Sequence, residues 1–406
     1  MLCPRGRAGS NPAPGISFGR PSRSRPPQHP RPHRLPRVPG RIVLFGATGY
    51  TGRLTAEALV GRGARPVLAA RSAQKLEALV GELGDPSLEV AVADVARLET
   101  ISSLVERGDA LVTTVGPFGR FGRPALEAAI ASRASYIDST GEPAFVREVF
   151  ERYGPSAQRA GCGLLTAFGF DYVPGNLAGA LALREADTRA ARLDIGYFVT
   201  GRSAAGVWSG GTLASMAGAL TAPGFAFRNG RLASTANGRH VRSFELRGKR
   251  TSAISVGGSE HLTLPRIEPA LREVGVYVGA AGRLSRGLQG LSIPTGVLAR
   301  APVTGSALRA LSARAPGGSS GGPDAAARAR SGSHVIAIAY DGNGRELSEV
   351  RLDGQNPYAF TAGALAWGAE RAADLGLETT GALGPAEAFG IGALEHGCRE
   401  AGLARV

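Results

Sequence analysis

The chain has 406 residues, of which 43% are apolar, so it is long enough for two domains with a large core. The net charge of +14 would suit a nucleic-acid binder, but eight arginines and no acid lie in residues 1–40, and subtracting them leaves +6 for the rest. Three cysteines and the lack of any run of about 20 strongly apolar residues exclude a disulfide-rich secreted protein and a membrane-spanning one. We expect a cytoplasmic protein.

Residues 1–40 are rich in Arg, Pro, Gly and Ser, and we expect them to be disordered because they hold too little apolar surface to fold. Three interpretations are open: a basic arm for nucleic acid or acidic lipid, a targeting peptide, or upstream sequence from a start codon assigned too early. We favour the third, because 45 arginines against two lysines indicate a GC-rich bacterial genome and Val38 precedes the first predicted strand. The targeting interpretation is the weakest, since no amphipathic stretch accompanies the arginines.

The stretch Arg41 to Gly52, RIVLFGATGYTG, predicts a nucleotide-binding turn. A short apolar strand over 42–45 is followed by three glycines at a spacing of three, and then by apolar residues at helical spacing. This geometry binds a dinucleotide pyrophosphate, because glycines let the backbone approach the phosphates and the helix N–H groups hold the anion. The predicted contacts are Gly46, Ala47, Thr48, Gly49, Tyr50, Thr51 and Gly52.

The second predicted strand, 66–70, points to the choice between NAD and NADP. An NAD site has a carboxylate near this strand end for the ribose 2′-hydroxyl, whereas this chain continues as Arg71 and Ser72. A guanidinium pairs with a 2′-phosphate, so we predict NADP(H). Arg71 and Ser72 would bind the 2′-phosphate, and Lys75 would add a further contact. The alternative is that Arg71 is a solvated residue at the start of a helix over 73–82.

Further strands at 88–94, 109–115, 135–138 and 163–168 alternate with helices at 124–133 and 143–153. This alternation predicts an α/β fold, a Rossmann-type doubly wound parallel sheet at 41–170. Asp94 and Val95 are placed to meet the adenine, although Asp94 is nearly as well suited to cap the next helix. The turn at Gly116 and Pro117 follows the fourth strand, and we expect the nicotinamide and its ribose above it.

Beyond residue 170, strand-like segments recur without alternating helices, at 192–199, 243–256, 273–279, 333–340 and 346–352. They predict a second α+β domain built on an antiparallel sheet at 171–355. Helices are predicted at 206–219 and 302–313 and a Gly/Ser loop at 316–323, and the uncharged stretch 203–227 would suit an acyl chain. Two more predicted helices, 358–375 and 385–400, lead us to expect that residues 356–406 return to the nucleotide domain.

Five motifs in this order resemble the saccharopine dehydrogenase-like oxidoreductases: RIVLFGATGYTG, LAARSAQKL, TVGPF, SYIDSTGE and FGFDYVP. The C-terminal GALGPAEAFG is similar to the bacterial branch, which includes trans-acting enoyl reductases that serve polyketide and glycolipid assembly. The resemblance covers about residues 41–406 and implies an NADP-binding oxidoreductase. The family often has His before the Tyr of the YID strand, where this chain has Ser135, so no role is carried over to a histidine there.

Several kinds of chemistry are excluded or weakened by the residues themselves. The Tyr-x-x-x-Lys pair of short-chain reductases is missing, because Arg71 and Glu245 stand four residues before the two lysines. We predict no metal site, since His396 and Cys398 form the only close His/Cys pair. His240, His261 and His334 are interpreted as ordinary surface or core residues.

The proton that accompanies hydride transfer needs a donor. Tyr172 is our first candidate and Asp138 the second, with bulk water as a third. Asp171 is as well placed to face a substrate as to cap the next helix.

The leading hypothesis is an NADPH-dependent reductase of an enoyl or acyl lipid or polyketide-type intermediate, with a small-molecule or carrier-linked acyl substrate. One alternative is a redox sensor that binds NADP without turnover. Another is a true saccharopine dehydrogenase, for which Arg202, Arg242 and Arg247 are available. Nucleic acid is not expected as a partner. A homodimer is compatible with the sequence, as is peripheral contact at the inner face of the plasma membrane, although no anchor is visible.

Overall fold

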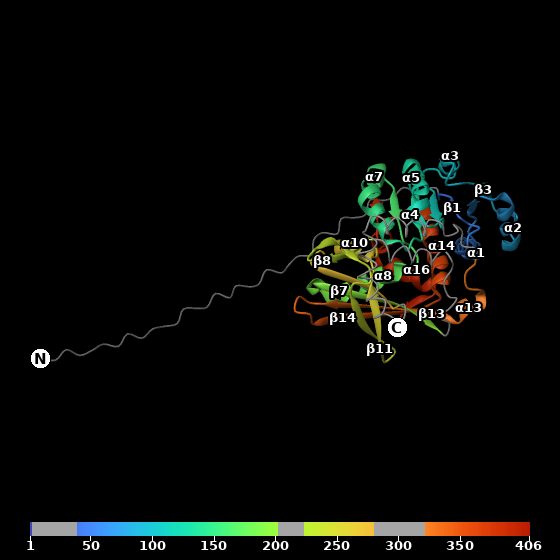
Figure 1. Ribbon diagram of the computed structural model, residues 1–406. Coiled ribbons are helices and arrows are strands. Elements are labelled where there is room, and N and C mark those ends of the chain that lie inside the picture. The colour runs from blue at the N-terminus through green and yellow to red at the C-terminus, as the bar shows by residue number, and fades with distance from the viewer. Residues whose placement is uncertain (2–38, 202–222, 280–320) are drawn as a thin grey trace, which may run out of the picture. The chain divides into compact units, whose positions relative to one another are not determined.

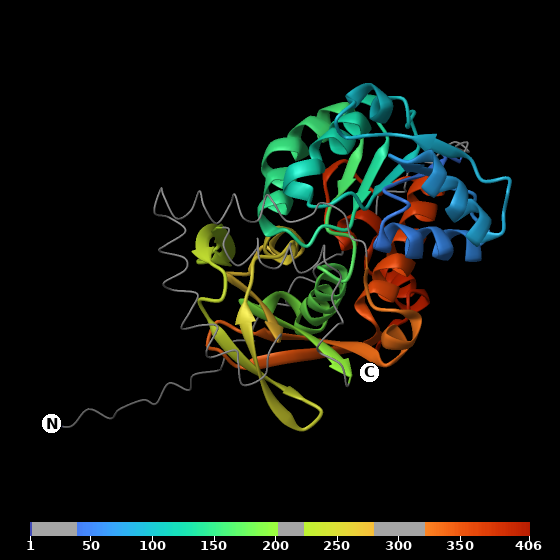
Figure 2. The ribbon, with the colours of Figure 1, turned by 45° about the vertical axis from the view of Figure 1, so that its right-hand side comes forward.

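The computed structural model describes Met1 and residues 39–201, 223–279 and 321–406 (Figures 1 and 2). Several predictions fall wholly or mostly outside these ranges: the disordered segment 1–40, the helices 206–219 and 302–313, the loop 316–323 and the uncharged stretch 203–227. Within the stretch 203–227, residues 223–227 belong to strand β8 (Pro223–Arg228).

The first sheet has seven strands, all parallel, in the order β15-β6-β5-β4-β1-β2-β3. Its central strands are buried along their whole length, which explains their almost continuous apolar sequences. The strands are β1 (Ile42–Phe45), β2 (Val67–Ala70), β3 (Val90–Val92), β4 (Ala110–Thr113), β5 (Ser135–Asp138), β6 (Gly163–Leu165) and β15 (Gly381–Ala382).

Helices connect these strands and pack on the sheet, which confirms the doubly wound parallel architecture. They are α1 (Tyr50–Gly61), α2 (Ala73–Leu83), α3 (Leu98–Ser102), α4 (Phe118–Phe121), α5 (Arg123–Ser132), α6 (Pro143–Glu148) and α7 (Gly154–Ala160). A π-helical turn, Val149–Tyr153, joins α6 to α7, so the helix predicted to end at 153 continues to 160.

The second sheet runs in the order β10-β11-β12-β7-β13-β14-β16, with β8 beside β12 and β9 beside β8. Most neighbours are antiparallel, but β12 and β7 are parallel, so the sheet is mixed rather than purely antiparallel as predicted. The reason is that the chain leaves β7 and returns to it through β8–β11 and α10 instead of a direct hairpin. The strands are β7 (Arg192–Gly201), β9 (Arg231–Ala236), β10 (Val241–Leu246), β11 (Lys249–Ser255), β12 (Glu273–Gly279), β13 (Ser331–Tyr340), β14 (Glu346–Gln355) and β16 (Leu403–Arg405).

Helix α8 (Val173–Ala186) leads from the first sheet into the second and packs on β13 and β14. Twelve of its 14 residues are buried, including Asn176, because neighbouring elements cover almost every side of it. The short helix α10 (Glu260–Ile267) packs on α8 and on β12. Between α8 and β7 the chain forms a single 3-10 turn, Asp187–Arg189.

The C-terminal part of the chain contacts both sheets (Figure 2). Helix α14 (Pro357–Leu375) packs on α1, β4 and β5, whereas β16 pairs with β14 of the second sheet. The predicted helix 385–400 is two helices, α15 (Pro385–Phe389) and α16 (Ile391–Glu400), because Gly390 between them has a φ of +76° that a helix does not allow. A further short helix, α13 (Ala325–Ala329), precedes β13.

Candidate functional site

The glycine turn joins β1 to α1 as the sequence predicts. Gly46 has a φ of +91°, and a Cβ at Gly52 would lie 2.1 Å from the carbonyl oxygen of Gly46. Gly49 is the N-cap of α1, whose first N–H groups have no acceptor within the helix. Ala47, Thr48 and Thr51 lie within this turn and the first turn of α1. The chain therefore has the close strand–helix approach and the helix N-terminus that a pyrophosphate needs.

The side chain of Tyr50 contacts residues far along the chain. Its hydroxyl donates a hydrogen bond to the carbonyl oxygen of Pro323 at 2.5 Å and accepts one from Arg328 at 3.1 Å. Its ring also lies edge-on to Tyr358, 5.1 Å between centroids. Only the main chain of Tyr50 is left for a phosphate, while Arg328, which the sequence did not single out, adds positive charge beside the N-terminus of α1.

Arg71 and its neighbours follow β2 on the same sheet edge. The Arg71 side chain is exposed and forms no ion pair with any residue that the structure describes. Ser72 is the N-cap of α2 and accepts a hydrogen bond from the N–H of Lys75 at 3.3 Å. Ser72 thus begins a helix, and the unpaired guanidinium next to it suits a 2′-phosphate.

The residues predicted to meet the adenine lie in a local turn. Oδ1 of Asp94 accepts a hydrogen bond from the N–H of Ala96 at 3.0 Å, and its main chain bonds Thr100. Asp94 and Val95 are both half-buried. Asp94 therefore organises the turn before α3 but does not cap that helix, whose N-cap is Arg97 without a side-chain hydrogen bond. The contact of Asp94 with adenine stays a prediction.

The turn after β4 is tied to the turn after β5 by one carboxylate. Glu142 accepts hydrogen bonds from the N–H groups of Phe118 at 2.7 Å and Gly119 at 3.0 Å, just after Gly116 and Pro117. The sequence contains Glu142 within the motif SYIDSTGE but predicts no role for it. It fixes the loop expected below the nicotinamide.

Asp138 is completely buried at the end of β5. Its oxygens accept hydrogen bonds from the N–H groups of Thr140 and Ala167 at 2.9 Å each and from the hydroxyl of Thr166 at 2.8 Å. Burial raises the pKa of Asp138 to about 6, although these hydrogen bonds oppose the shift. This environment is that of a carboxyl group that joins two loops, not of one that meets a substrate.

Asp171 and Tyr172 lie where the chain passes from β6 to α8. A Cβ at Gly141, after β5, would lie 2.9 Å from Oδ2 of Asp171, so this carboxylate stands over the sheet edge. Asp171 is exposed, yet the protein atoms crowded around it raise its pKa to about 6 by desolvation. Tyr172 is buried, and its hydroxyl donates to the carbonyl oxygen of Gly141 at 3.3 Å. Burial raises the pKa of the Tyr172 phenol far above 10.

Behind Tyr172 lies a buried carboxylate that the sequence did not single out. Oε1 of Glu260, at the start of α10, is 2.5 Å from the hydroxyl of Tyr197, which also contacts the carbonyl oxygen of Tyr172 at 3.2 Å. Oε2 of Glu260 is buried without a hydrogen-bond partner. Burial raises the pKa of Glu260 to about 8, so it is largely protonated at neutral pH. An acid at the start of a short helix after Gly257-Gly258 was the only signal in the sequence.

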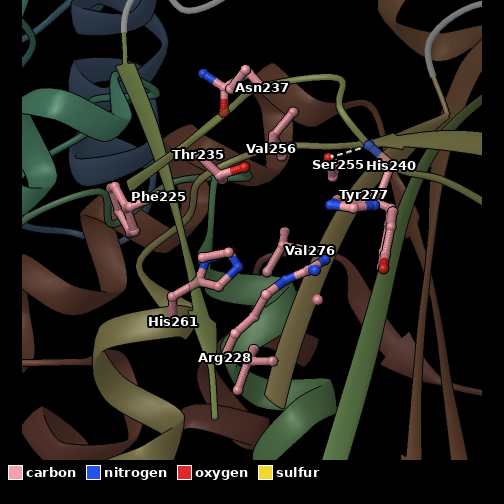
Figure 3. Close-up of a pocket in the computed structure, with 14 residues that line it drawn as sticks. Phe225, Arg228, Thr235, Asn237, His240, Ser255, Val256, His261, Val276 and Tyr277 are labelled. Carbon is pink, nitrogen blue, oxygen red and sulfur yellow. Dashed lines mark hydrogen bonds between the residues drawn. The ribbon is translucent and has the colours of Figure 1, made fainter. Parts of the chain in front are cut away.

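A pocket lies on the second sheet between the hairpin β8–β9, the strands β11 and β12 and the start of α10 (Figure 3). Its cavity volume is about 20 Å³, roughly enough for one water molecule, and the pocket opens to solvent. The polar residues that line it are Arg228, Thr235, Asn237, His240, Ser255, His261 and Tyr277. The nearby loop reaches the first sheet's helices, because a Cβ at Gly257 would lie 3.1 Å from the Cβ of Pro143.

Two arginines considered for an acidic amino-acid substrate are paired within the protein. Arg242 lies 2.6 Å from Oδ2 of Asp194, and Arg247 lies 3.4 Å from Oδ2 of Asp353. Arg202 lies outside the described residues. Within 39–201, 223–279 and 321–406, no group of three His, Cys, Asp or Glu side chains is close enough to hold a metal ion, and no helix has the length and apolarity to cross a bilayer.

A comparison with protein families finds a match to the part of the chain that forms most of the first sheet. Residues 42–164 match the family described as the saccharopine dehydrogenase NADP binding domain. The match runs from β1 into β6 and includes the glycine turn and Arg71. This part of the chain is similar to NADP-binding domains of that type, in line with the resemblance of its motifs.

Relatives and one solved structure extend the comparison. A Mycobacterium tuberculosis protein named provisionally as a trans-acting enoyl reductase is 40% identical over 182 residues, 43% of each chain. A trans-acting enoyl reductase of Mycobacterium ulcerans is 38% identical over 140 residues, 34% of each chain. The matches thus span less than half the length of either relative. The apo saccharopine dehydrogenase (L-Glu forming) of Saccharomyces cerevisiae has a TM-score of 0.56 at 11% identity, over 90% of this chain and 100% of that one, and so shares the fold.

Proposed function

We propose that this chain, whose residues 42–164 match the saccharopine dehydrogenase NADP binding domain, is an NADP(H)-dependent oxidoreductase that reduces an enoyl or acyl lipid or polyketide-type intermediate. The observation that carries the proposal is one sheet edge that holds both the glycine turn after β1 and, beside Gly141, the accessible carboxylate of Asp171. In open α/β sheets, ligands bind outside the carboxyl ends of the strands. The names of the mycobacterial relatives, both trans-acting enoyl reductases, support the enoyl substrate.

The residues of the first domain fit NADP(H). The turn from Gly46 to Gly52 would hold the pyrophosphate, and a Cβ at Gly52 would fill the space that the turn leaves for close approach. Arg71 would pair with the 2′-phosphate, and the loop after β4 would support the nicotinamide. The cofactor, when bound, supplies the hydride.

Reduction of an enoyl thioester also needs a proton at the α-carbon. Asp171 suits this role better than Tyr172 or Asp138, because it is accessible and has a pKa of about 6, near the working pH. Tyr172, with its raised pKa, stays protonated and holds its hydroxyl on the carbonyl of Gly141. Its contribution is to fix the segment that presents Asp171. After donating its proton, the Asp171 carboxylate would be protonated again from solvent.

Two other functions compete with this one. A redox sensor that binds NADP without turnover requires only the first domain. The alternative of saccharopine dehydrogenase activity is weakened, because Arg242 and Arg247 are paired with carboxylates within the protein. A carrier-linked acyl substrate, a homodimer, and a cytoplasmic or peripheral membrane location are part of our proposal for the first function.

The test is calorimetric titration of the chain with NADPH and NADH, followed by an assay of NADPH oxidation with 2-enoyl thioesters. Arg71→Ala should lose about tenfold or more in NADPH affinity with little change for NADH, because it removes a charge-assisted pair. Arg65→Ala is the matched control, since Arg65 is an exposed arginine just before β2. Absence of binding by either nucleotide would refute the oxidoreductase. Binding without any turnover would favour the sensor.

A further inference from the structure

The pocket on the second sheet contains a guanidinium that forms no ion pair within the described ranges. It belongs to Arg228, the last residue of β8, which is exposed and whose side chain also forms no hydrogen bond with a described residue. In Figure 3 its guanidinium reaches into the pocket, between His261 on one side and His240 and Tyr277 on the other. A guanidinium in this position offers several N–H donors to an incoming group.

Two histidines line the pocket with Arg228, and burial together with the positive charge of Arg228 lowers the pKa of both. His261 is buried, and its Nδ1 lies 3.1 Å from the main chain of Gly258, so the rest of its ring is left to face the pocket. Burial, followed by the charge of Arg228, lowers the pKa of His261 to about 4. The pKa of His240 is also lowered, first by burial and then by Arg228 and Arg239. Both rings are therefore neutral at pH 7 and add donors without adding charge.

Hydroxyl groups complete the lining. The hydroxyl of Ser255 accepts a hydrogen bond from the main-chain N–H of His240 at 3.1 Å, which leaves its own proton for another acceptor. Thr235, on β9, carries a hydroxyl that has no partner among the described residues. The carboxylate of Asp194, whose charge interacts with the pocket, forms ion pairs with Arg242 and Arg192. The pocket is thus rich in donors and has a net positive charge.

We propose that this pocket binds an oxyanion, either the phosphate or the carboxylate at one end of a small molecule or of a carrier-linked substrate. Arg228 makes the charge-assisted contact, for which its planar guanidinium suits both groups. The imidazole rings of His240 and His261 and the hydroxyls of Ser255 and Thr235 supply the remaining donors. The site lies on β8, β9, β11, the loop before β10 and the start of α10, and it uses no residue of the nucleotide turn. It therefore stands independently of the reductase proposal.

The test follows the imidazole proton signals of the full chain by NMR at pH 7.5, in titrations with inorganic phosphate and with acetate at constant ionic strength. The variants His240→Gln and His261→Gln assign the two signals. We expect either anion to shift both signals with saturation in the millimolar range. Arg228→Gln should weaken this binding at least fivefold.

Arg231→Gln is the matched control, because Arg231 is the exposed residue opposite Arg228 in the same hairpin but does not line the pocket. It should change binding less than twofold. Saturation by phosphate alone would identify a phosphate end, and saturation by acetate alone a carboxylate end. No shift with either anion, or equal weakening by both arginine variants, would overturn the proposal. Since NADPH is not part of the titration, failure of the reductase proposal leaves this result unaffected.

Discussion

Tyr50, the first residue of α1, donates its phenolic hydrogen to the carbonyl oxygen of Pro323, at 2.5 Å and 273 positions further along the chain. Arg328 binds both of these oxygens, at 3.1 Å from the Tyr50 hydroxyl and 2.9 Å from the Pro323 carbonyl. The segment before β13 is therefore fastened to the N-terminal end of α1. Nucleotide binding and the order of this segment should depend on each other.

Tyr50→Phe should loosen the segment 323–329 while leaving the ring contact with Tyr358 in place. Loss of the hydroxyl should cost about 1 kcal/mol of stability, and hydrogen exchange of the α13 amides should become faster. Tyr153→Phe is the control, because the Tyr153 hydroxyl donates to Glu127, far from this segment. The control should lose a similar amount of stability while hydrogen exchange of the α13 amides stays unchanged. Unchanged α13 exchange in Tyr50→Phe would contradict the prediction.

Gly52→Ala should be severely destabilising, because its Cβ would lie 2.1 Å from the main-chain oxygen of Gly46, which cannot move away without breaking the turn. We expect a loss of more than about 2 kcal/mol in urea unfolding. Gly61→Ala, in the same helix, has no atom within 4 Å of its new Cβ. It should raise stability by about 0.5–1 kcal/mol, since alanine favours the helix. Equal effects of the two changes would show that α1 does not pack so closely on the turn.

Glu260→Gln should remove a pH dependence of stability. Burial raises the pKa of Glu260 from its ordinary value of 4.5 to about 8 in the folded protein. Between these two pH values the folded state therefore holds a proton that the unfolded chain has lost. Stability should therefore fall as the pH rises from about 4.5 through 8, and the variant should be more stable than the parent at pH 9 by about 2–5 kcal/mol. The raised pKa of Asp138 acts in the same direction up to about pH 6, and comparing parent with variant cancels it. A constant difference from pH 5 to 9 in urea unfolding would disprove this assignment.

Asp171→Asn should remove the acid from the proposed proton transfer. If Asp171 donates the proton, kcat/KM of the parent falls about tenfold per pH unit above its pKa of about 6, since the donor is then deprotonated. The variant should lose at least about tenfold in kcat and should lack this pH limb. Asp187→Asn, at an exposed acid beyond the end of α8, should behave like the parent. An unaltered pH profile in Asp171→Asn would assign the proton to water or to Tyr172.

The sequence predicts six of the seven strands of the parallel sheet, because these are short, largely apolar and alternate with helices. It misses β15, whose two residues, Gly381 and Ala382, are too few to show a pattern and lie far along the chain from their partner strand β6. It also predicts the glycine turn, because glycines at 46 and 52 are what the close approach of the helix to the turn requires. The role of Tyr50 could not be foreseen, because its partner, Pro323, is distant in the chain. The parallel pairing of β7 with β12 was equally hidden, since periodicity reveals strands but not their neighbours.

The polar residues of the site show the same limit. Glu260 and His261 look ordinary in sequence, and only the packing of α10 against α8 and β12 buries them. The sequence predicts His240 and His261 to be ordinary surface or core residues, and it does not show that both line one pocket with Arg228. Asp138 looked catalytic at a strand end, but its three hydrogen bonds are to neighbouring loops. Burial and long-range pairing decide these roles, and neither can be read from spacing.

The path of the last 50 residues has a consequence for biosynthesis. Strand β15 borders β6, and α14 covers α1, so the ribosome makes parts of the first sheet's surroundings only after strands β7 to β14 of the second sheet. A nascent chain that ends near residue 170 lacks both elements, and its α1 is left without the helix that packs beside it. Domains usually fold as they emerge, but here the nucleotide domain lacks β15 and α14 until strands β7 to β14 of the second sheet have been made. The first sheet should therefore reach its full packing close to the point at which β16 pairs with β14 in the second sheet.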